Sequence, residues 1–107
     1  MRVGTDQSNG SEEDMQYVLI IHEVEDYAAW KTVFDNAAQI RKDAGELSYQ
    51  LLKFETDANN LVHFSRWSSL QDAKGFFESE RLVEIRKQAG VKAPTFVYLD
   101  EIENRIL

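Results

Sequence analysis

The chain has 107 residues, enough for one domain with a hydrophobic core of its own. Its formal net charge of −7 at pH 7 argues against nucleic acids and anionic membranes as partners, because both select for fields of lysine and arginine. The absence of cysteine excludes disulfides, thiolate metal ligands and a cysteine nucleophile. No apolar run approaches the roughly 18 residues of a membrane span, and no secretory signal is recognisable, so we expect a cytoplasmic protein.

The first residues differ in character from the rest. Residues 1–14 contain glycine, serine, asparagine and acids but almost nothing to bury, which predicts a flexible tail before a single domain at residues 15–107. The next segment, Gln16–Glu25, is rich in valine and isoleucine, which is typical of a buried strand.

A helix is expected after this strand. The carboxylate of Asp26 can accept hydrogen bonds from the amides of a first helical turn, and Gly45 can end the helix in a left-handed conformation. Between them lies an apolar stripe at helical spacing, which ends in an arginine with an aliphatic stem. The stripe consists of Trp30, Val33, Phe34, Ala37 and Arg41.

A hairpin and a second helical region follow. Two β-prone runs, Ser48–Phe54 and Leu61–Trp67, are separated by residues 55–60, in which aspartate and asparagine favour a turn. Ser69 and Ser79 then offer N-caps for two short helices.

The last element is predicted to be a strand. Gly90 ends the helical region, Pro94 blocks its continuation, and Thr95–Ile102 is β-prone. The element order is therefore β-α-β-β-α-β. Right-handed crossovers fold this order into a four-stranded antiparallel sheet, spatial order 4-1-3-2, with helices on one face, which is the ferredoxin-like α+β arrangement.

The two histidines are predicted to share one face of this sheet. Centring Tyr17–Glu25 on Leu61–Trp67 pairs residues whose numbers sum to about 85, which places His22 opposite His63. The same face also carries Ile20, Val24, Ser65 and Trp67.

The two faces are expected to have different neighbours. The histidine face combines apolar walls with a few polar groups, as ligand cavities do, and we expect a second copy of the chain to cover it as a symmetric homodimer. The opposite face is nearly all apolar and is expected to pack under the helices. It carries Tyr17, Leu19, Ile21, Val62 and Phe64.

Several short motifs point to a known family. The segment HEVEDYAAW at 22–30, DANN at 57–60 before a strand ending in Trp67, and SERL at 79–82 resemble the dimeric α/β-barrel proteins of the antibiotic biosynthesis monooxygenase type. The resemblance implies a ferredoxin-like subunit whose sheet pairs with a second sheet around a cavity. The family includes cofactor-independent monooxygenases of aromatic polyketides, haem-degrading enzymes, isomerases and members of unassigned activity, so the fold does not choose a reaction.

One departure from the family pattern concerns haem. Haem-degrading relatives carry an axial histidine three residues before a serine that matches Ser79, and this chain has Phe76 at that position. The resemblance therefore argues against haem degradation, and we expect no cofactor.

His22 has two interpretations. It can act as a general base towards a phenol or enol, or it can bond a neighbouring strand or the region of Asp26. The expected proximity of His63 leaves both open. We expect no metal site, because Glu23 and Glu25 point to the face opposite His22.

The predicted site has His22 and His63 as catalytic candidates, with ligand contacts from Ile20, Val24, Tyr27, Ser65 and Trp67. The leading hypothesis is a homodimer that binds a small apolar or aromatic organic molecule in a cavity on the sheet face. A cofactor-independent monooxygenase or isomerase with a strand histidine as base is one alternative. A non-catalytic stress-related or assembly module is the other.

Overall fold

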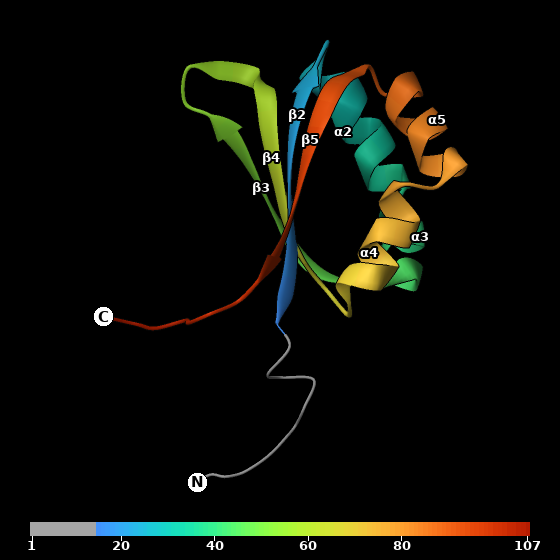
Figure 1. Cartoon of the computed structure of the whole chain (residues 1–107). Coiled ribbons are helices and arrows are strands. Elements are labelled where there is room, and N and C mark those ends of the chain that lie inside the picture. The colour runs from blue at the N-terminus through green and yellow to red at the C-terminus, as the bar shows by residue number, and fades with distance from the viewer. Residues whose placement is uncertain (1–14) are drawn as a thin grey trace, which may run out of the picture.

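The computed structural model describes residues 15–107, so the predicted tail at residues 1–14 lies outside the described part. Figure 1 shows one layer of strands and one layer of helices. In chain order the elements are β2 (Gln16–Val24), α2 (Tyr27–Asn36), α3 (Ala38–Ala44), β3 (Glu46–Phe54), β4 (Asp57–Trp67), α4 (Leu70–Phe77), α5 (Glu80–Gln88) and β5 (Val91–Asp100).

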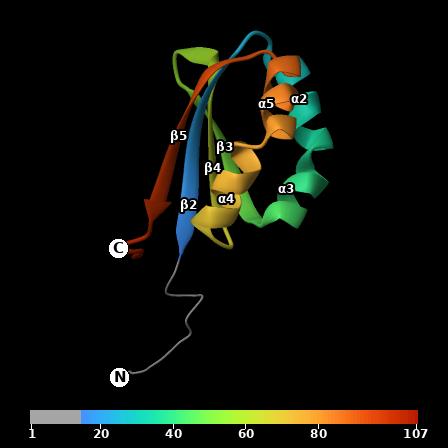
Figure 2. The ribbon, with the colours of Figure 1, turned by 45° about the vertical axis from the view of Figure 1, so that its right-hand side comes forward.

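The sheet has the predicted topology. Its strand order is β3-β4-β2-β5 and every neighbouring pair is antiparallel, which confirms the order 4-1-3-2. All four helices lie on one side of the sheet in both ribbon views (Figures 1 and 2). The ferredoxin-like α+β fold is thus confirmed. Among residues 15–107, no helix is long and apolar enough to cross a membrane.

The predicted helix caps are confirmed. The side chains of Asp26, Ser69 and Ser79 each accept a hydrogen bond from the amide three residues further on, at 3.0, 3.0 and 3.3 Å. Gly45 follows α3 with φ of 128°, a conformation that glycine adopts without a Cβ penalty. The capping residues therefore fix where each helix begins over the sheet.

The first predicted helix is broken in two at Ala37. The amide of Ala37 donates to the carbonyl oxygens of Val33 and Phe34, and the side chain of Arg41 donates from Nη1 to the Phe34 oxygen at 2.6 Å. A side chain that donates a hydrogen bond to a helical carbonyl oxygen interrupts the regular backbone hydrogen bonding of the helix at that point. The break is thus a consequence of Arg41 folding back beneath α2.

The last three strands begin earlier than predicted, β3 at Glu46, β4 at Asp57 and β5 at Val91, and β5 ends at Asp100. The hairpin turn is only residues 55–56, because β4 already begins at Asp57. The last strand begins at Val91 and includes Pro94. Proline is tolerated there because β5 is an edge strand and its register against β2 shifts between Ile21 and Glu23, around His22.

The prediction of which face the helices cover was wrong. The helices lie on the histidine face, where Val18, Ile20 and Trp67 are at most 1% exposed and pack against α4. Among residues 15–107, no helix lies over the face with Tyr17 and Phe64. Both faces are apolar enough to be buried, so apolarity alone could not predict which face the helices cover. Of the buried polar residues on the covered face, His63 and Ser65 have hydrogen-bond partners inside the protein.

The predicted register was wrong by two residues. His22 lies opposite Leu61, and His63 lies opposite Ile20. Because side chains alternate with period two, this shift leaves both histidines on one face. Their ring centroids are 6.5 Å apart, as diagonal rather than direct neighbours.

Candidate functional site

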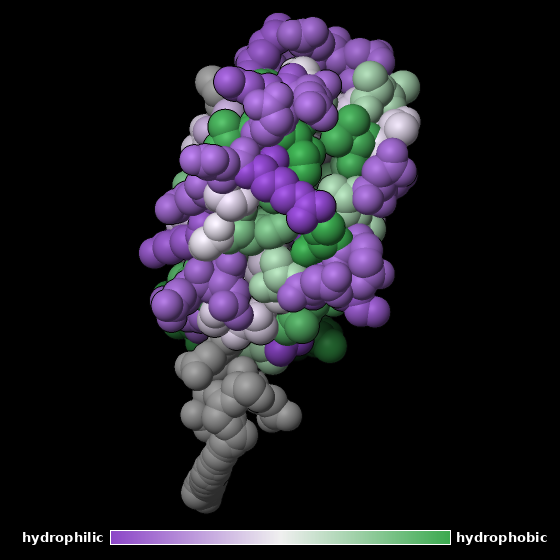
Figure 3. Space-filling model, turned by 90° about the vertical axis from the view of Figure 1, so that its right-hand side faces the viewer, coloured by the Kyte–Doolittle hydropathy of each residue, from purple (hydrophilic) through white to green (hydrophobic). Residues whose placement is uncertain are grey.

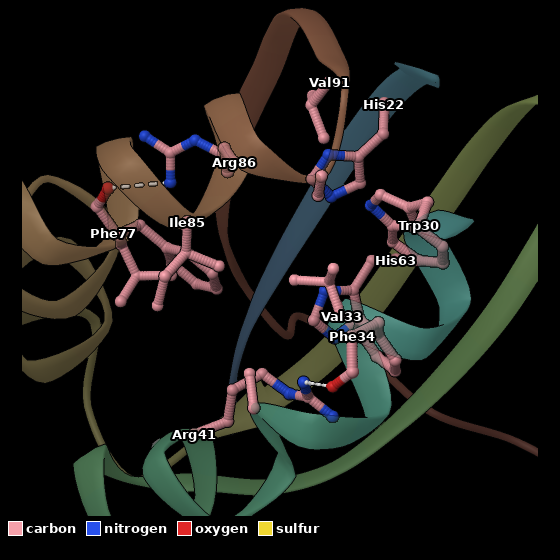
Figure 4. A pocket seen from close by; sticks show the side chains of 13 residues that line it. His22, Trp30, Val33, Phe34, Arg41, His63, Phe77, Ile85, Arg86 and Val91 are labelled. Carbon is pink, nitrogen blue, oxygen red and sulfur yellow. Dashed lines mark hydrogen bonds between the residues drawn. The ribbon is translucent and has the colours of Figure 1, made fainter. Parts of the chain in front are cut away.

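A small cavity lies between the histidine face of the sheet and the helices (Figure 4). Its volume is about 50 Å³. Strands β2, β4 and β5 supply one wall, and helices α2 to α5 supply the rest. The lining residues are mostly apolar: His22, Trp30, Val33, Phe34, Ala37, Arg41, His63, Phe77, Leu82, Ile85, Arg86, Ala89 and Val91.

A buried charged cluster holds His63 at the wall of this cavity. His63 Nε2 lies 2.8 Å from Glu46 Oε2, and Arg41 Nε donates to Glu46 Oε1, also at 2.8 Å. The three side chains are 2–6% exposed. Because the Arg41 guanidinium also lies 3.7 Å from the Phe34 ring centroid, its charge is enclosed by an aromatic face as well as by the carboxylate.

The carboxylate of Glu46 is ionised in this setting. Burial by itself raises the pKa of Glu46, but hydrogen bonds and charge attraction from His63 and Arg41 outweigh burial and lower that pKa overall. A buried carboxylate with two such partners satisfies both of its oxygens. Glu46 is therefore a fixed hydrogen-bond acceptor for the imidazole.

His22 has no comparable support. Its side chain is almost fully buried, and its Nδ1 has no hydrogen-bond partner among residues 15–107. Burial, followed by repulsion from His63 and Arg86, lowers the pKa of His22 to about 3. His22 is thus neutral at physiological pH and carries a buried nitrogen with unmet hydrogen-bonding capacity beside the cavity.

Aromatic rings fix the orientation of His63. Phe34 and Tyr49 meet it edge-on, with ring centroids at 5.0 and 5.7 Å, and Phe77 lies at 6.5 Å. Trp30 packs beside His22 at 5.6 Å. The two imidazoles therefore stand in a rigid, largely apolar wall.

The predicted ligand contacts lie close to the cavity without lining it. Ile20, Val24, Ser65 and Trp67 are all at most 2% exposed and pack in the core, with Trp67 Nε1 donating to Ser65 Oγ at 2.8 Å. Tyr27 is 42% exposed and lies over a separate surface hollow near Leu51. Of the predicted set, only the two histidines line the cavity.

Two residues of the site were missed from the sequence. Arg41 stood at the end of an apolar helical stripe, and a buried arginine at such a position requires a buried acid. The sequence could not predict the face on which Glu46 lies, because the register of β3 shifts between Glu46 and Ser48. That irregularity turns Glu46 to the histidine face, which strict alternation from Ser48 does not predict.

Neither a cluster of metal-binding side chains nor a histidine at the family's haem-ligand position is found in the described part of the chain. Among residues 15–107, no group of three histidine, aspartate or glutamate side chains is placed to hold a metal ion. Phe76, at the position of the family's haem ligand, packs against Trp67 and Phe77, with ring centroids 5.6 and 5.2 Å apart.

The strand order and the single helical layer define the fold class: the chain has the ferredoxin-like fold of antibiotic biosynthesis monooxygenase domain proteins. SnoaB, a cofactor-independent oxygenase from Streptomyces nogalater, superposes with a TM-score of 0.70 at 13% identity over 85% of this chain and 96% of that one. A monooxygenase from Streptomyces coelicolor, solved in complex with nanaomycin D, superposes with a TM-score of 0.62 at 18% identity. The match covers 90% of this chain and 95% of that one.

A third similar structure comes from Caulobacter crescentus, and its assignment as an antibiotic biosynthesis monooxygenase is provisional. It gives a TM-score of 0.66 at 23% identity over 85% of this chain and 92% of that one. No protein-family model matches the sequence, and no curated protein sequence matches it. The resemblance noted in the sequence is therefore confirmed in the fold.

Proposed function

We propose that the chain binds a small, mainly apolar or aromatic molecule in the cavity between the sheet and the helices. The observation that carries this proposal is an apolar cavity beside two buried imidazoles, one of which has an unpartnered nitrogen. Ligand sites combine apolar walls with a few convergent polar groups in this way. A ligand hydroxyl that donates to His22 Nδ1 removes the cost of leaving that atom unpaired.

The cavity has to widen to accept an aromatic ring. Its volume of about 50 Å³ is well below the roughly 150 Å³ of an apolar cavity that holds benzene. Figure 3 shows hydrophobic patches between hydrophilic side chains on the helical side, and we propose that the ligand enters from this side. We infer that α5 moves to admit the ligand, because Leu82, Ile85 and Arg86 of this helix line the cavity.

The biological unit in this proposal is a homodimer formed through the open face of the sheet. On that face Tyr17 and Phe64 stack with ring centroids 5.1 Å apart, and Leu52 and Val97 remain 51% and 39% exposed. A contiguous apolar sheet face of this kind is rarely left in water. A second copy is the occupant we propose, packed face to face.

A cofactor-independent oxygenase is the second candidate, favoured by the bond between His63 and Glu46. A carboxylate-supported imidazole can remove a proton from a phenol, and dioxygen is then the oxidant. In such a reaction, one phenol and one dioxygen give one quinone and one water. Two similar structures are described as a cofactor-independent oxygenase and a monooxygenase, which supports this candidate by analogy of fold.

Ligand binding can be tested by filling the cavity. We expect phenol to shift the NMR signals of the Trp30 indole in the wild-type chain, and Ala89→Leu to weaken phenol binding by about tenfold or more, because the new side chain occupies the cavity. Ala28→Leu adds the same atoms at an exposed site of α2 and serves as the control. Equal phenol binding by both variants would contradict a ligand site in this cavity.

The catalytic alternative needs a separate test. Dioxygen consumption is measured with a panel of hydroxynaphthalenes, and His63→Ala is expected to abolish any turnover found. Unchanged turnover in both His22→Ala and His63→Ala would exclude the imidazoles as bases. Binding without any dioxygen consumption leaves the ligand-binding proposal as the function.

A further inference from the structure

We propose that Arg41 and Glu46 are positioning residues that fix which nitrogen of His63 faces a ligand as an acceptor. This inference rests on the proposed function, since it assigns His63 a role towards the cavity. The observation is the continuous buried chain of contacts from Arg41 through Glu46 to His63 Nε2, with both links at 2.8 Å.

The chemistry of a carboxylate sets the tautomer. An ionised carboxylate can only accept hydrogen bonds, so the imidazole nitrogen facing Glu46 must carry the proton. In the neutral ring, the lone pair is then on Nδ1. Glu46 therefore selects Nδ1 as the atom of His63 that can accept a proton or a hydrogen bond.

Arg41 fixes the carboxylate in turn. Its Nη1 donates to the buried Phe34 carbonyl oxygen in the last turn of α2, and its Nε donates to Glu46. One side chain thus ties Glu46 to the helix backbone. The break at Ala37 is consequently part of the site, because the Phe34 carbonyl accepts there from the Ala37 amide and from Arg41, whereas a continuous α-helix would pair it with the amide of residue 38.

The two histidines differ in their hydrogen-bond partners. His22 lies beside the cavity without a carboxylate partner among the described residues, whereas His63 has one at hydrogen-bond distance. Only His63 has the support that stabilises an imidazolium. His63 is therefore the base in this site, and His22 is a neutral hydrogen-bond acceptor.

The test uses the full chain labelled with ¹⁵N-histidine, which contains only two histidines to assign. We expect one imidazole to be protonated on Nε2, with an N–H proton that exchanges slowly with water and disappears in His63→Gln. Glu46→Gln is expected to speed that exchange on the order of tenfold, because the acceptor loses its charge.

A double variant tests the same point without leaving a buried charge unpaired. Arg41→Met with Glu46→Leu replaces the pair by apolar side chains and is expected to lose the slow N–H signal and to give mixed tautomers. Asp35→Asn removes an exposed carboxylate from the Lys31 pair and is expected to change nothing.

Two results would overturn the assignment: a wild-type His63 protonated on Nδ1, or a double variant that keeps the slow Nε2–H signal. Neither depends on a ligand. A chain that binds no phenol would overturn the proposed function and leave the tautomer result standing.

Discussion

The two faces of the sheet are both mainly apolar, yet they differ in what covers them and in the polar residues that they carry. The helix-covered face holds His22, His63 and Ser65 at 1–5% exposure, and two of these three have polar partners inside the protein. The open face carries aliphatic and aromatic side chains such as Leu52, Val97 and Phe64, and no helix among residues 15–107 covers it. The contrast teaches that buried, hydrogen-bonded polar residues distinguish the covered face, whereas the mainly apolar open face, which also carries Arg66 and Gln50, is the one we propose for a second sheet.

The largest expected effect concerns the charged cluster of the covered face. Glu46→Leu leaves the Arg41 guanidinium buried without its carboxylate, and we expect a loss of about 3–5 kcal/mol in the free energy of unfolding. Urea denaturation measures it. Asp35→Asn, at a partly exposed ion pair, is the control and is expected to cost less than about 1 kcal/mol. Equal losses in the two variants would mean that burial of the cluster adds nothing to the free energy of unfolding.

The next effect concerns the open face. Val97→Asp places a charge in the proposed dimer interface, and we expect the dimer to weaken at least about 100-fold, or roughly 2.7 kcal/mol. Sedimentation equilibrium measures the association constant. Val83→Asp, at an exposed site of α5, is the matched control, since Val83 and Val97 are 41% and 39% exposed. A wild-type monomer, or a dimer unaffected by Val97→Asp, would refute the interface.

A third effect tests the neutral histidine of the covered face. The folded-state pKa of His22 is about 3, below the ordinary value of 6.5, so the unfolded chain binds the proton first as the pH falls. Stability from this group is complete above about pH 6.5 and declines below it by about 1.4 kcal/mol per pH unit. Between pH 7 and 5 we expect the wild type to lose about 2 kcal/mol more than His22→Phe, measured by urea denaturation. Parallel losses would show that His22 titrates normally.

The smallest effect concerns access to the covered face. Ser79 caps α5, and Ser79→Ala is expected to cost about 1 kcal/mol and to open this helix more often. Hydrogen exchange of the α5 amides, followed by mass spectrometry, detects the change. Exposed Ser48 on β3 provides the control, since Ser48→Ala is expected to stay within about 0.5 kcal/mol of the wild type. Unchanged α5 exchange would argue against a cap-controlled opening.

The sequence predicted the elements that depend on local signals. Asp26, Ser69 and Ser79 marked helix starts through side chains that bond their own first turns, and strand alternation placed both histidines on one face. The covered face could not be predicted, because both faces have the apolarity that burial requires. Glu46 was hidden by a register irregularity, which only the paired strands reveal.

Pro94 has a consequence for how copies of this chain can meet. It lies in β5, an edge strand, and lacks the backbone N–H that would extend the sheet sideways. An edge that is interrupted in this way resists the open-ended strand addition that leads to fibrils. Growth of the sheet beyond β5 is thereby discouraged, which agrees with the proposed face-to-face pairing of two copies.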